Sequence, residues 1–167
     1  MIRTASIDDT ARIAEIYRYY VEESVASFET VAPTPEEMAG RMRGILGRYP
    51  FLVAEEDGCI KGYAYAHEWK ARAAYADTWE TTIYLDKDCC GRGLGRRLME
   101  RLIEECRRGG ARALIADITA GNQASERLHA GLGFERVSYF PKVGHKLGRE
   151  LDVTDYQLIL EPQNQGT

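Results

Sequence analysis

The sequence has no long apolar run, no excess of basic residues and no paired cysteine motif. No segment approaches the roughly 18 consecutive apolar residues of a membrane-spanning helix. The first residues, Met1–Thr4, lack the apolar segment of a signal peptide. The 26 acidic residues outnumber the 22 basic ones, and a net charge of −4 argues against nucleic acid as the main ligand. We therefore expect neither a membrane nor a nucleic acid as a partner.

The four cysteines show no metal-ligand spacing and no CxxC pair. This cysteine usage and the missing signal segment predict a reduced, cytoplasmic protein without a bound metal. The sequence also has no internal repeat and no low-complexity linker. A chain of 167 residues with 44% hydrophobic content is long enough for one packed core. We predict one domain over residues 1–160 and a frayed tail over 161–167.

Turn and capping signals divide the chain into strands and helices. Thr34, Pro35 and Glu37 form the N-terminal signature of a helix, and Asp57-Gly58 between two apolar runs indicates a hairpin. In order, we predict a strand at 2–5, a helix after Ser6, a helix from Pro35, strands at 51–55, 60–67 and 79–85, a helix from 94 to about 109, a strand at 113–118, a helix at 122–132, and strands at 134–139 and 153–160. This order predicts an α/β fold with a mixed central sheet and helices on both faces.

Three alternating glycines stand between the predicted strand 79–85 and the helix after it. The segment Cys90–Arg96 reads Cys-Gly-Arg-Gly-Leu-Gly-Arg. Because backbone N–H groups at a helix N-terminus are unpaired, such a turn can hold a phosphate or pyrophosphate. It is not a P-loop, since no Lys-Ser/Thr pair follows, and Arg96 replaces the third glycine of a dinucleotide-binding fingerprint. Taken alone, the turn could equally be only a tight strand-to-helix connection.

A second segment, Asn122–Phe134, favours ligand binding by the turn. It reads Asn-Gln-Ala-Ser-Glu-Arg-Leu-His-Ala-Gly-Leu-Gly-Phe. Together the two segments resemble the pyrophosphate loop, (Gln/Arg)-x-x-Gly-x-(Gly/Ala), and the Asn-x-x-(Ala/Ser) to Gly-Phe segment of the GNAT superfamily of acyl-CoA-dependent N-acetyltransferases. The resemblance implies a GNAT fold, whose central sheet is mostly antiparallel, and acetyl-CoA as the co-substrate.

Four further segments make the chain similar to a narrower branch, the phosphinothricin and methionine sulfoximine acetyltransferases. They are residues 27–30, 69–75, 78–85 and 143–149. Three positions differ from the branch pattern. Cys90 stands where the loop usually begins with Arg or Gln, Trp79 where Thr is usual, and Glu150 where Trp is frequent. These differences affect one side-chain contact of the loop and one edge of the pocket, while the backbone cradle is unaffected.

The resemblance assigns the catalytic roles to Glu80 and His129. Glu80 would be the general base that deprotonates the substrate amine, directly or through a water. Position alone would make Glu80 a surface or ion-paired glutamate. His129 stands where many relatives carry a tyrosine acid, and it would protonate the leaving thiolate or relay protons from the amine. The alternative for His129 is a histidine that only packs on its helix.

The resemblance also implies how the cofactor is held. Backbone N–H groups of residues 83–85 would bind the thioester carbonyl and the pantetheine, which requires this strand to separate from its neighbour, as at a bulge. Asn122 would bind pantetheine or a water, or would only cap its helix. The expected cofactor-binding set is Ile83, Tyr84, Leu85, Gly91, Arg92, Gly93, Leu94, Gly95, Arg96, Asn122 and Ser125.

A small amino-acid-like substrate needs a cation for its carboxylate. By resemblance Arg72 supplies it beside Tyr75, and Phe28 walls the pocket. The alternatives are a solvated arginine and a core phenylalanine. The resemblance implies direct acetylation of a phosphinothricin- or methionine sulfoximine-type amine by a homodimer. A peptide N-terminus or polyamine as the substrate, favoured by an open acidic groove, and a non-catalytic acyl-CoA-binding module are the alternative functions.

Overall fold

A computed structural model describes residues 1–161 of the chain. Its helices and strands are β1 (Ile2–Thr4), α1 (Thr10–Glu22), α2 (Pro35–Ile45), β2 (Phe51–Glu56), β3 (Cys59–Glu68), β4 (Thr78–Leu85), α3 (Leu94–Arg108), β5 (Ala113–Thr119), α4 (Gln123–Gly131), β6 (Glu135–Arg136), β7 (Phe140–Lys146) and β8 (Arg149–Ile159). Beyond Glu161, the tail predicted at 161–167 lies outside the described residues. Within residues 1–161, no helix is both long enough and apolar enough to cross a membrane.

Local signals in the sequence fix several element boundaries. Thr34 Oγ1 accepts from the Glu37 N–H at 3.1 Å, and Glu37 Oε2 accepts from the Thr34 N–H at 2.8 Å, which completes the predicted capping box of α2. Asp57 and Gly58 adopt positive φ angles of 51° and 72° in the turn between β2 and β3. The predicted helix and hairpin are therefore confirmed at these positions.

The strands form one mixed sheet in the order β1-β2-β3-β4-β5-β8-β6, with β7 paired to β8. Every recorded pairing is antiparallel except that of β4 with β5, which run parallel. The mostly antiparallel sheet predicted from the resemblance is confirmed. The single parallel pair lies in the middle of the sheet, and its connection is α3.

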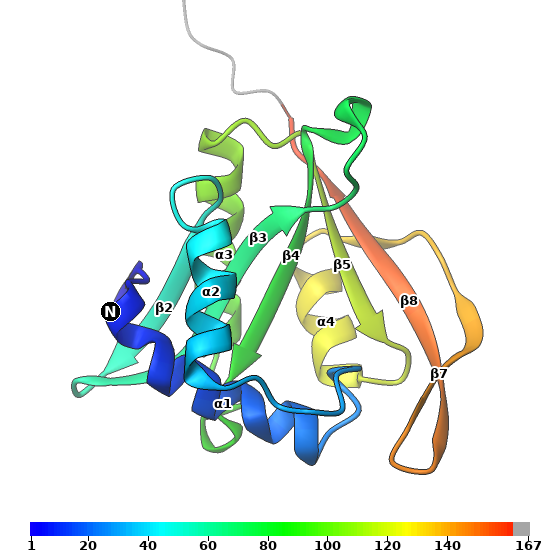
Figure 1. The fold of residues 1–167 in the computed structure, drawn as a ribbon. Coiled ribbons are helices and arrows are strands. Elements are labelled where there is room, and N and C mark those ends of the chain that lie inside the picture. The colour runs from blue at the N-terminus through cyan, green and yellow to red at the C-terminus, as the bar shows by residue number, and fades with distance from the viewer. Residues whose placement is uncertain (162–167) are drawn as a thin grey trace, which may run out of the picture.

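The parallel pair β4–β5 separates after only three residues. Thr78–Glu80 pairs with Ala113–Ile115, and the two strands then diverge toward their carboxyl ends (Figure 1). β4 stays in continuous register with β3 as far as Leu85, so the predicted separation occurs without a bulge between these two strands. The backbone groups on one edge of β4 thus have no strand partner beyond Glu80, and this opens the centre of the sheet.

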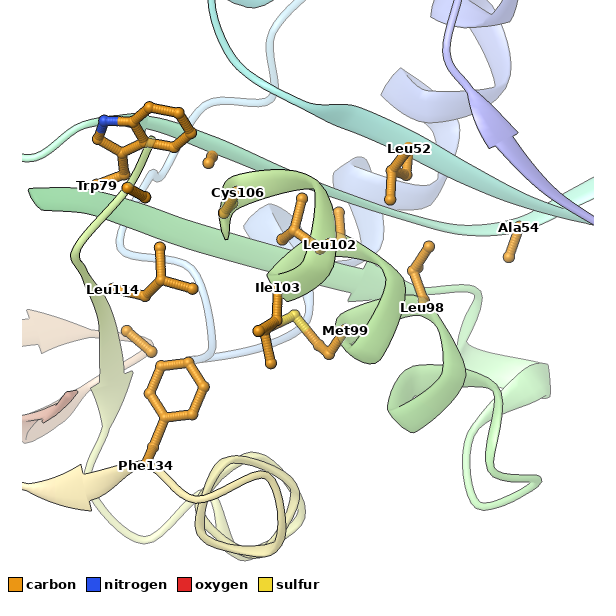
Figure 2. Packing of buried hydrophobic residues seen from close by; sticks show 14 of the residues in the cluster. Leu52, Ala54, Trp79, Leu98, Met99, Leu102, Ile103, Cys106, Leu114 and Phe134 are labelled. Carbon is orange, nitrogen blue, oxygen red and sulfur yellow. The ribbon is translucent and has the colours of Figure 1, made fainter. Parts of the chain in front are cut away.

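Helices cover both faces of the sheet, as predicted. Figure 1 shows α1 and α2 in front of the sheet and α3 behind it. The α3 side holds the larger core, in which Leu98, Met99 and Leu102 are fully buried against β2, β3 and β4 (Figure 2). Burying each such side chain contributes about 1.5–3 kcal/mol, so this core gives the strands beside the opening a rigid support.

The carboxyl-terminal strands differ from the prediction of strands at 134–139 and 153–160. β6 has only two residues, β7 is an additional strand, and β8 begins at Arg149. β7 and β8 are joined by Leu147 and Gly148, which adopt φ angles of 52° and 71° in a two-residue hairpin turn. Leucine is uncommon in the left-handed region, and an irregular register between Phe140 and Gly144 breaks the alternation. Both features conceal the hairpin in the sequence.

Candidate active site

The gap between β4 and β5 leads into a cavity of about 840 Å³, a size typical of ligand sites. Its walls come from the loop between α1 and α2, the open edge of β4, the glycine turn before α3, the end of β5 and the first turns of α4. Of the residues expected from the sequence, the cavity is lined by Phe28, Glu80, Ile83, Tyr84, Leu85, Gly91, Gly93, Gly95, Arg96, Asn122, Ser125 and His129.

The glycine turn has the backbone geometry of an anion cradle. Gly91 and Gly93 adopt φ angles of 78° and 76°, which disfavour other residues, and no atom lies within 4 Å of where a Cβ would stand on either glycine. Gly93 is the N-cap of α3 and supplies no side-chain cap, so the first N–H groups of the helix remain available. A Cβ on Gly95 would lie 3.3 Å from the Leu85 side chain. The turn therefore leaves room for a phosphate group at a helix N-terminus.

The arginines of the turn differ in their position. Arg96 lines the cavity, and its Nε lies 2.9 Å from Glu100 on the next turn of α3. Arg92 is outside the cavity lining and donates from Nη2 to the Asp88 carbonyl at 3.0 Å. The Leu94 side chain is buried in the core, so only its backbone could contact a ligand. The predicted positive charge is therefore present in the cavity at Arg96 but not at Arg92.

The open edge of β4 presents the backbone of alternate residues. Just before β4, the Asp77 carbonyl accepts from the Arg112 N–H, which precedes β5. Just after β4, the Asp86 N–H donates to the Lys61 carbonyl on β3. Since backbone groups alternate along an antiparallel strand, Ile83 and Leu85 face the opening, and the Tyr84 N–H faces β3. The Tyr84 N–H is therefore turned away from the opening, whereas the Tyr84 side chain lines the cavity.

Glu80 lies where β4 and β5 separate, with its side chain 27% exposed. Burial raises the pKa of its carboxyl to about 7, and the nearby charges of Asp117 and Asp155 act in the same direction. His67 Nε2, on the paired residue of β3, is 3.8 Å from Glu80 Oε1. A carboxyl group with a pKa near 7 is suited to accept a proton at neutral pH.

Asp117 and Asp155 face each other across the β5–β8 pair. Desolvation, and then the charge of Asp155, raise the pKa of Asp117. The side of the cavity that holds Glu80 and Asp117 is thus acidic.

His129 is 3% exposed and packs edge-on against Phe134, with ring centroids 5.0 Å apart. Its Nδ1 lies 2.8 Å from the Ser125 carbonyl oxygen, which can only accept, so Nδ1 carries the hydrogen in this bond. Burial lowers the pKa of His129 and favours the neutral ring. The other nitrogen, Nε2, is then a proton acceptor on a residue that lines the cavity. His129 is therefore both packed and accessible to a ligand.

Asn122 caps α4, since its Oδ1 accepts from the Ser125 N–H at 3.3 Å. It also lines the cavity, so the capping role does not exclude ligand contact.

Phe28 and Glu29 reach the cavity from the loop between α1 and α2. Phe28 is 43% exposed, so the alternative of a core phenylalanine is wrong. The Glu29 carboxylate accepts from Arg41 at 2.6 and 2.8 Å and from the Tyr17 hydroxyl. These donors, and Arg41 above all, lower the pKa of Glu29, so its carboxylate stays ionised and its charge is balanced by Arg41.

Arg72 and Tyr75 are exposed on the connection between β3 and β4 and are not part of the cavity lining. The Tyr75 ring stacks edge-on against Trp69 at 5.3 Å, and Lys70 Nζ lies over both rings. Within residues 1–161 of one chain, the expected carboxylate partner is therefore not brought together with Glu80.

The sequence did not identify several of these neighbours. His67, Glu29 and Asp117 are not among the site residues that the sequence predicts. The register of β3 with β4 places His67 beside Glu80, and that of β5 with β8 places Asp155 opposite Asp117. The sequence of a single strand does not show which strand pairs with it or in which register.

Comparison with known proteins agrees with this geometry. Residues 2–154 match the family model described as an acetyltransferase (GNAT) domain. The chain is 41% identical to a phosphinothricin N-acetyltransferase of Alcaligenes faecalis, over 99% of this chain and 83% of the relative. It is also 41% identical to an L-methionine sulfoximine/L-methionine sulfone acetyltransferase of Salmonella typhimurium, over 96% of this chain and 94% of the relative.

A solved structure extends the agreement to three dimensions. The phosphinothricin acetyltransferase of Sinorhizobium meliloti in complex with acetyl-CoA superposes with a TM-score of 0.93 at 36% identity. The match covers 99% of this chain and 94% of that one. Sequence and fold therefore agree over almost the whole length of both proteins.

Proposed function

This chain belongs to the GNAT acetyltransferase family, and we propose that it acetylates the amino group of a small amino acid of the phosphinothricin or methionine sulfoximine type. The enzyme is an acetyl-CoA-dependent N-acetyltransferase. The observation that carries the substrate proposal is the 41% identity to a phosphinothricin and to a methionine sulfoximine acetyltransferase. A carboxyl group with a pKa of about 7, at the point where the sheet opens, supports the chemistry.

Glu80 is the proposed general base. An amine near neutral pH carries a proton that must leave before its nitrogen can attack a carbonyl carbon. The Glu80 carboxylate takes this proton, directly or through a water, because a pKa of about 7 leaves it ionised in part and still basic. Replacing Glu80 by Gln keeps the shape and removes the base, so kcat should fall by about 10²- to 10⁴-fold. An unchanged kcat would contradict the role.

The cofactor would be held mainly by backbone groups. Acetyl-CoA supplies the acetyl group as an activated thioester. The backbone N–H groups of Ile83 and Leu85 face the opening and are the proposed donors to the carbonyl and the pantetheine amides. The turn Gly91–Arg96 and the N-terminus of α3 are the proposed pyrophosphate site, and Asn122 and Ser125 the proposed contacts from α4.

His129 is the proposed proton relay rather than an acid. Its Nδ1 hydrogen bond to the Ser125 carbonyl and its lowered pKa leave Nε2 as an acceptor. His129→Asn keeps a short N–H donor near Ser125 and removes the Nε2 position. We expect kcat to fall about tenfold or more while the KM of acetyl-CoA stays the same. A variant with full activity would leave His129 as a packing residue.

The substrate proposal has one specific competitor. Three carboxylates, those of Glu29, Glu80 and Asp117, line the cavity, while Arg72 does not. An acidic lining of this kind favours a polyamine or a peptide amine over an anionic amino acid. For the proposed substrate, Phe28 would wall the pocket, and Arg72 and Tyr75 would contact the part of the molecule that extends outside the cavity.

A panel of amines decides between these substrates. Methionine sulfoximine, methionine sulfone, phosphinothricin, spermidine and a short peptide are each incubated with enzyme and acetyl-CoA, and free thiol release is followed. We expect kcat/KM for one of the three amino-acid analogues to exceed that for spermidine and peptide by about 100-fold, because the chain is 41% identical to acetyltransferases named for such substrates. The reverse order would support the polyamine or peptide function. Acetyl-CoA binding without thiol release on any amine would support a non-catalytic module.

We also propose a homodimer in the cytoplasm. Val137, Tyr139, Phe140, Val143 and Leu147 are large apolar side chains exposed around β6 and β7. Grouped exposed apolar residues favour an interface, and a two-fold dimer is the commonest arrangement. Light scattering should give twice the chain mass of 18.8 kDa, and a monomer mass would contradict the proposal. Cell fractionation tests the location.

A further inference from the structure

Lys146, near the end of β7, is a buried lysine outside the cavity. Lys146 is 5% exposed, and its Nζ donates to the Ser27 carbonyl at 2.6 Å and to the Tyr20 carbonyl at 3.1 Å. Burial lowers the pKa of Lys146, and the Glu29 charge acts in the opposite direction. A buried ammonium group is costly unless donors and acceptors are matched, so these two carbonyls fix both the lysine and the chain that carries them.

The carbonyls that Lys146 binds belong to the segment leading to the cavity wall. Tyr20 lies on the last turns of α1, and Ser27 immediately precedes Phe28 and Glu29. Ser27 is itself buried, and its Oγ lies 2.8 Å from the Tyr17 hydroxyl and accepts from the Glu29 N–H at 3.2 Å. The segment from Ser27 to Glu29 is therefore held by three elements: Tyr17 of α1 and Arg41 of α2 bind its side chains, and Lys146 of β7 binds the Ser27 carbonyl.

A second contact joins the same strand to the same wall. Gly144 precedes Lys146 by two residues, which places both on one face of β7. The Phe28 ring lies so close to Gly144 that a Cβ there would overlap its ring atoms. β7 therefore touches the wall twice, through the backbone of Ser27 and through the side chain of Phe28.

We propose that Lys146 is a positioning residue for the acceptor amine. By binding the Ser27 and Tyr20 carbonyls, it holds Phe28 and Glu29 at the place where they meet the substrate. This inference rests on the proposed function, because it assumes that Phe28 and Glu29 form the acceptor side of the cavity. The Lys146 ammonium donates to the Tyr20 carbonyl at the end of α1 and to the Ser27 carbonyl of the loop, and neither acceptor belongs to the glycine turn that is proposed to hold the cofactor. It should therefore affect the acceptor and leave the cofactor site unchanged.

The test compares Lys146→Met with Lys61→Met. Lys61 lies on β3, does not line the cavity and takes no part in the contacts of Lys146 described above. Its replacement therefore removes an equal charge at another place. With the best amine of the panel, Lys146→Met should raise the acceptor KM about tenfold or more. The Kd of acetyl-CoA, measured by calorimetry, should stay within about twofold of the parent protein. Lys61→Met should change neither quantity.

Gly144→Ala perturbs the cavity wall at Phe28 without removing a charge. It is the second test variant if Lys146→Met fails to fold. The added methyl group must displace the Phe28 ring, so the same rise in acceptor KM with unchanged acetyl-CoA binding is expected. A folded Lys146→Met with a lower melting temperature and an unchanged acceptor KM would make the lysine merely structural and overturn the proposal. An equal rise in the acceptor KM and in the Kd of acetyl-CoA would also overturn the proposal. A parent enzyme that acetylates no amine would instead refute the proposed function.

Discussion

Asp117 on β5 lies directly opposite Asp155 on β8, and both carboxylates act on Glu80, the proposed base on β4. Like charges at directly opposite positions of two paired strands destabilise the fold. Here they raise the pKa of Glu80 together with its burial, so the acidic group keeps its proton at a higher pH. The groups that surround the Glu80 carboxyl are these two aspartates, His67 and Tyr65.

Asp155→Asn should move the acid limb of the activity profile to lower pH. Removing one negative charge favours the ionised form of Glu80, so its pKa falls from about 7 and the active base persists in more acidic solution. We expect a shift of about half to one pH unit in kcat/KM between pH 5 and 9. Asp152→Asn, also on β8 but bound to Tyr139 and the Lys142 N–H, is the matched control and should leave the limb in place. A limb that stays fixed or moves upward in Asp155→Asn would contradict the electrostatic account.

Glu80→Gln should stabilise the protein at alkaline pH. The pKa of Glu80 rises from 4.5 to about 7 on folding, so its favourable contribution is complete below pH 4.5 and is lost as the pH rises through 7. Glutamine imitates the protonated form at every pH. With a quarter of the side chain exposed, we expect a gain of about 1–2 kcal/mol in the free energy of unfolding at pH 8. Urea denaturation at pH 4 supplies the control, where the variant and the parent should agree. A gain of equal size at both pH values would point to another cause.

Gly93→Asp should weaken acetyl-CoA binding more than it weakens the fold. The substitution places a carboxylate at the N-terminus of α3, where the proposed pyrophosphate needs the same N–H groups. We expect the Kd of acetyl-CoA, measured by calorimetry, to rise about tenfold or more. Gly110→Asp is the control, because Gly110 has a similar φ angle of 97° and open surroundings after the end of α3. If both variants lost the same affinity, backbone strain would explain the loss.

Alkylation of Cys90 should inhibit the enzyme, and acetyl-CoA should protect it. Cys90 is exposed and lines the cavity, whereas Cys89 and Cys106 are buried and Cys59 is half-buried. A group added to its sulfur would occupy the entrance to the glycine turn. Rapid loss of activity with iodoacetamide, slowed by saturating acetyl-CoA and absent in Cys90→Ser, is the expected result. Inhibition that persists in Cys90→Ser would assign the effect to another thiol.

Local signals were sufficient for most of the fold. The capping box at Thr34, the Asp57-Gly58 turn and the glycines before α3 act within a few residues, so the sequence predicts their conformations directly. The hairpin of β7 and β8 escaped prediction because Leu147 adopts an uncommon left-handed conformation and no Asn-Gly or Asp-Gly pair indicates its turn. Lys146 and Gly144 lie on that hairpin, and the contacts they make are therefore absent from any sequence-based reading.

By itself, the sequence determined most of the elements, the glycine turn and the strand that carries Glu80, because backbone preference and side-chain periodicity are properties of short segments. Only the tertiary structure decided which carboxylates surround Glu80, which nitrogen of His129 is free and where Lys146 points. Those relationships depend on strand register and on the packing of segments distant in the chain, such as Ser27 with Lys146. The alternation of buried Trp79 and Thr81 with Glu80 sets the face of the sheet on which Glu80 lies, but it does not show which residues of β3 and β5 stand beside Glu80.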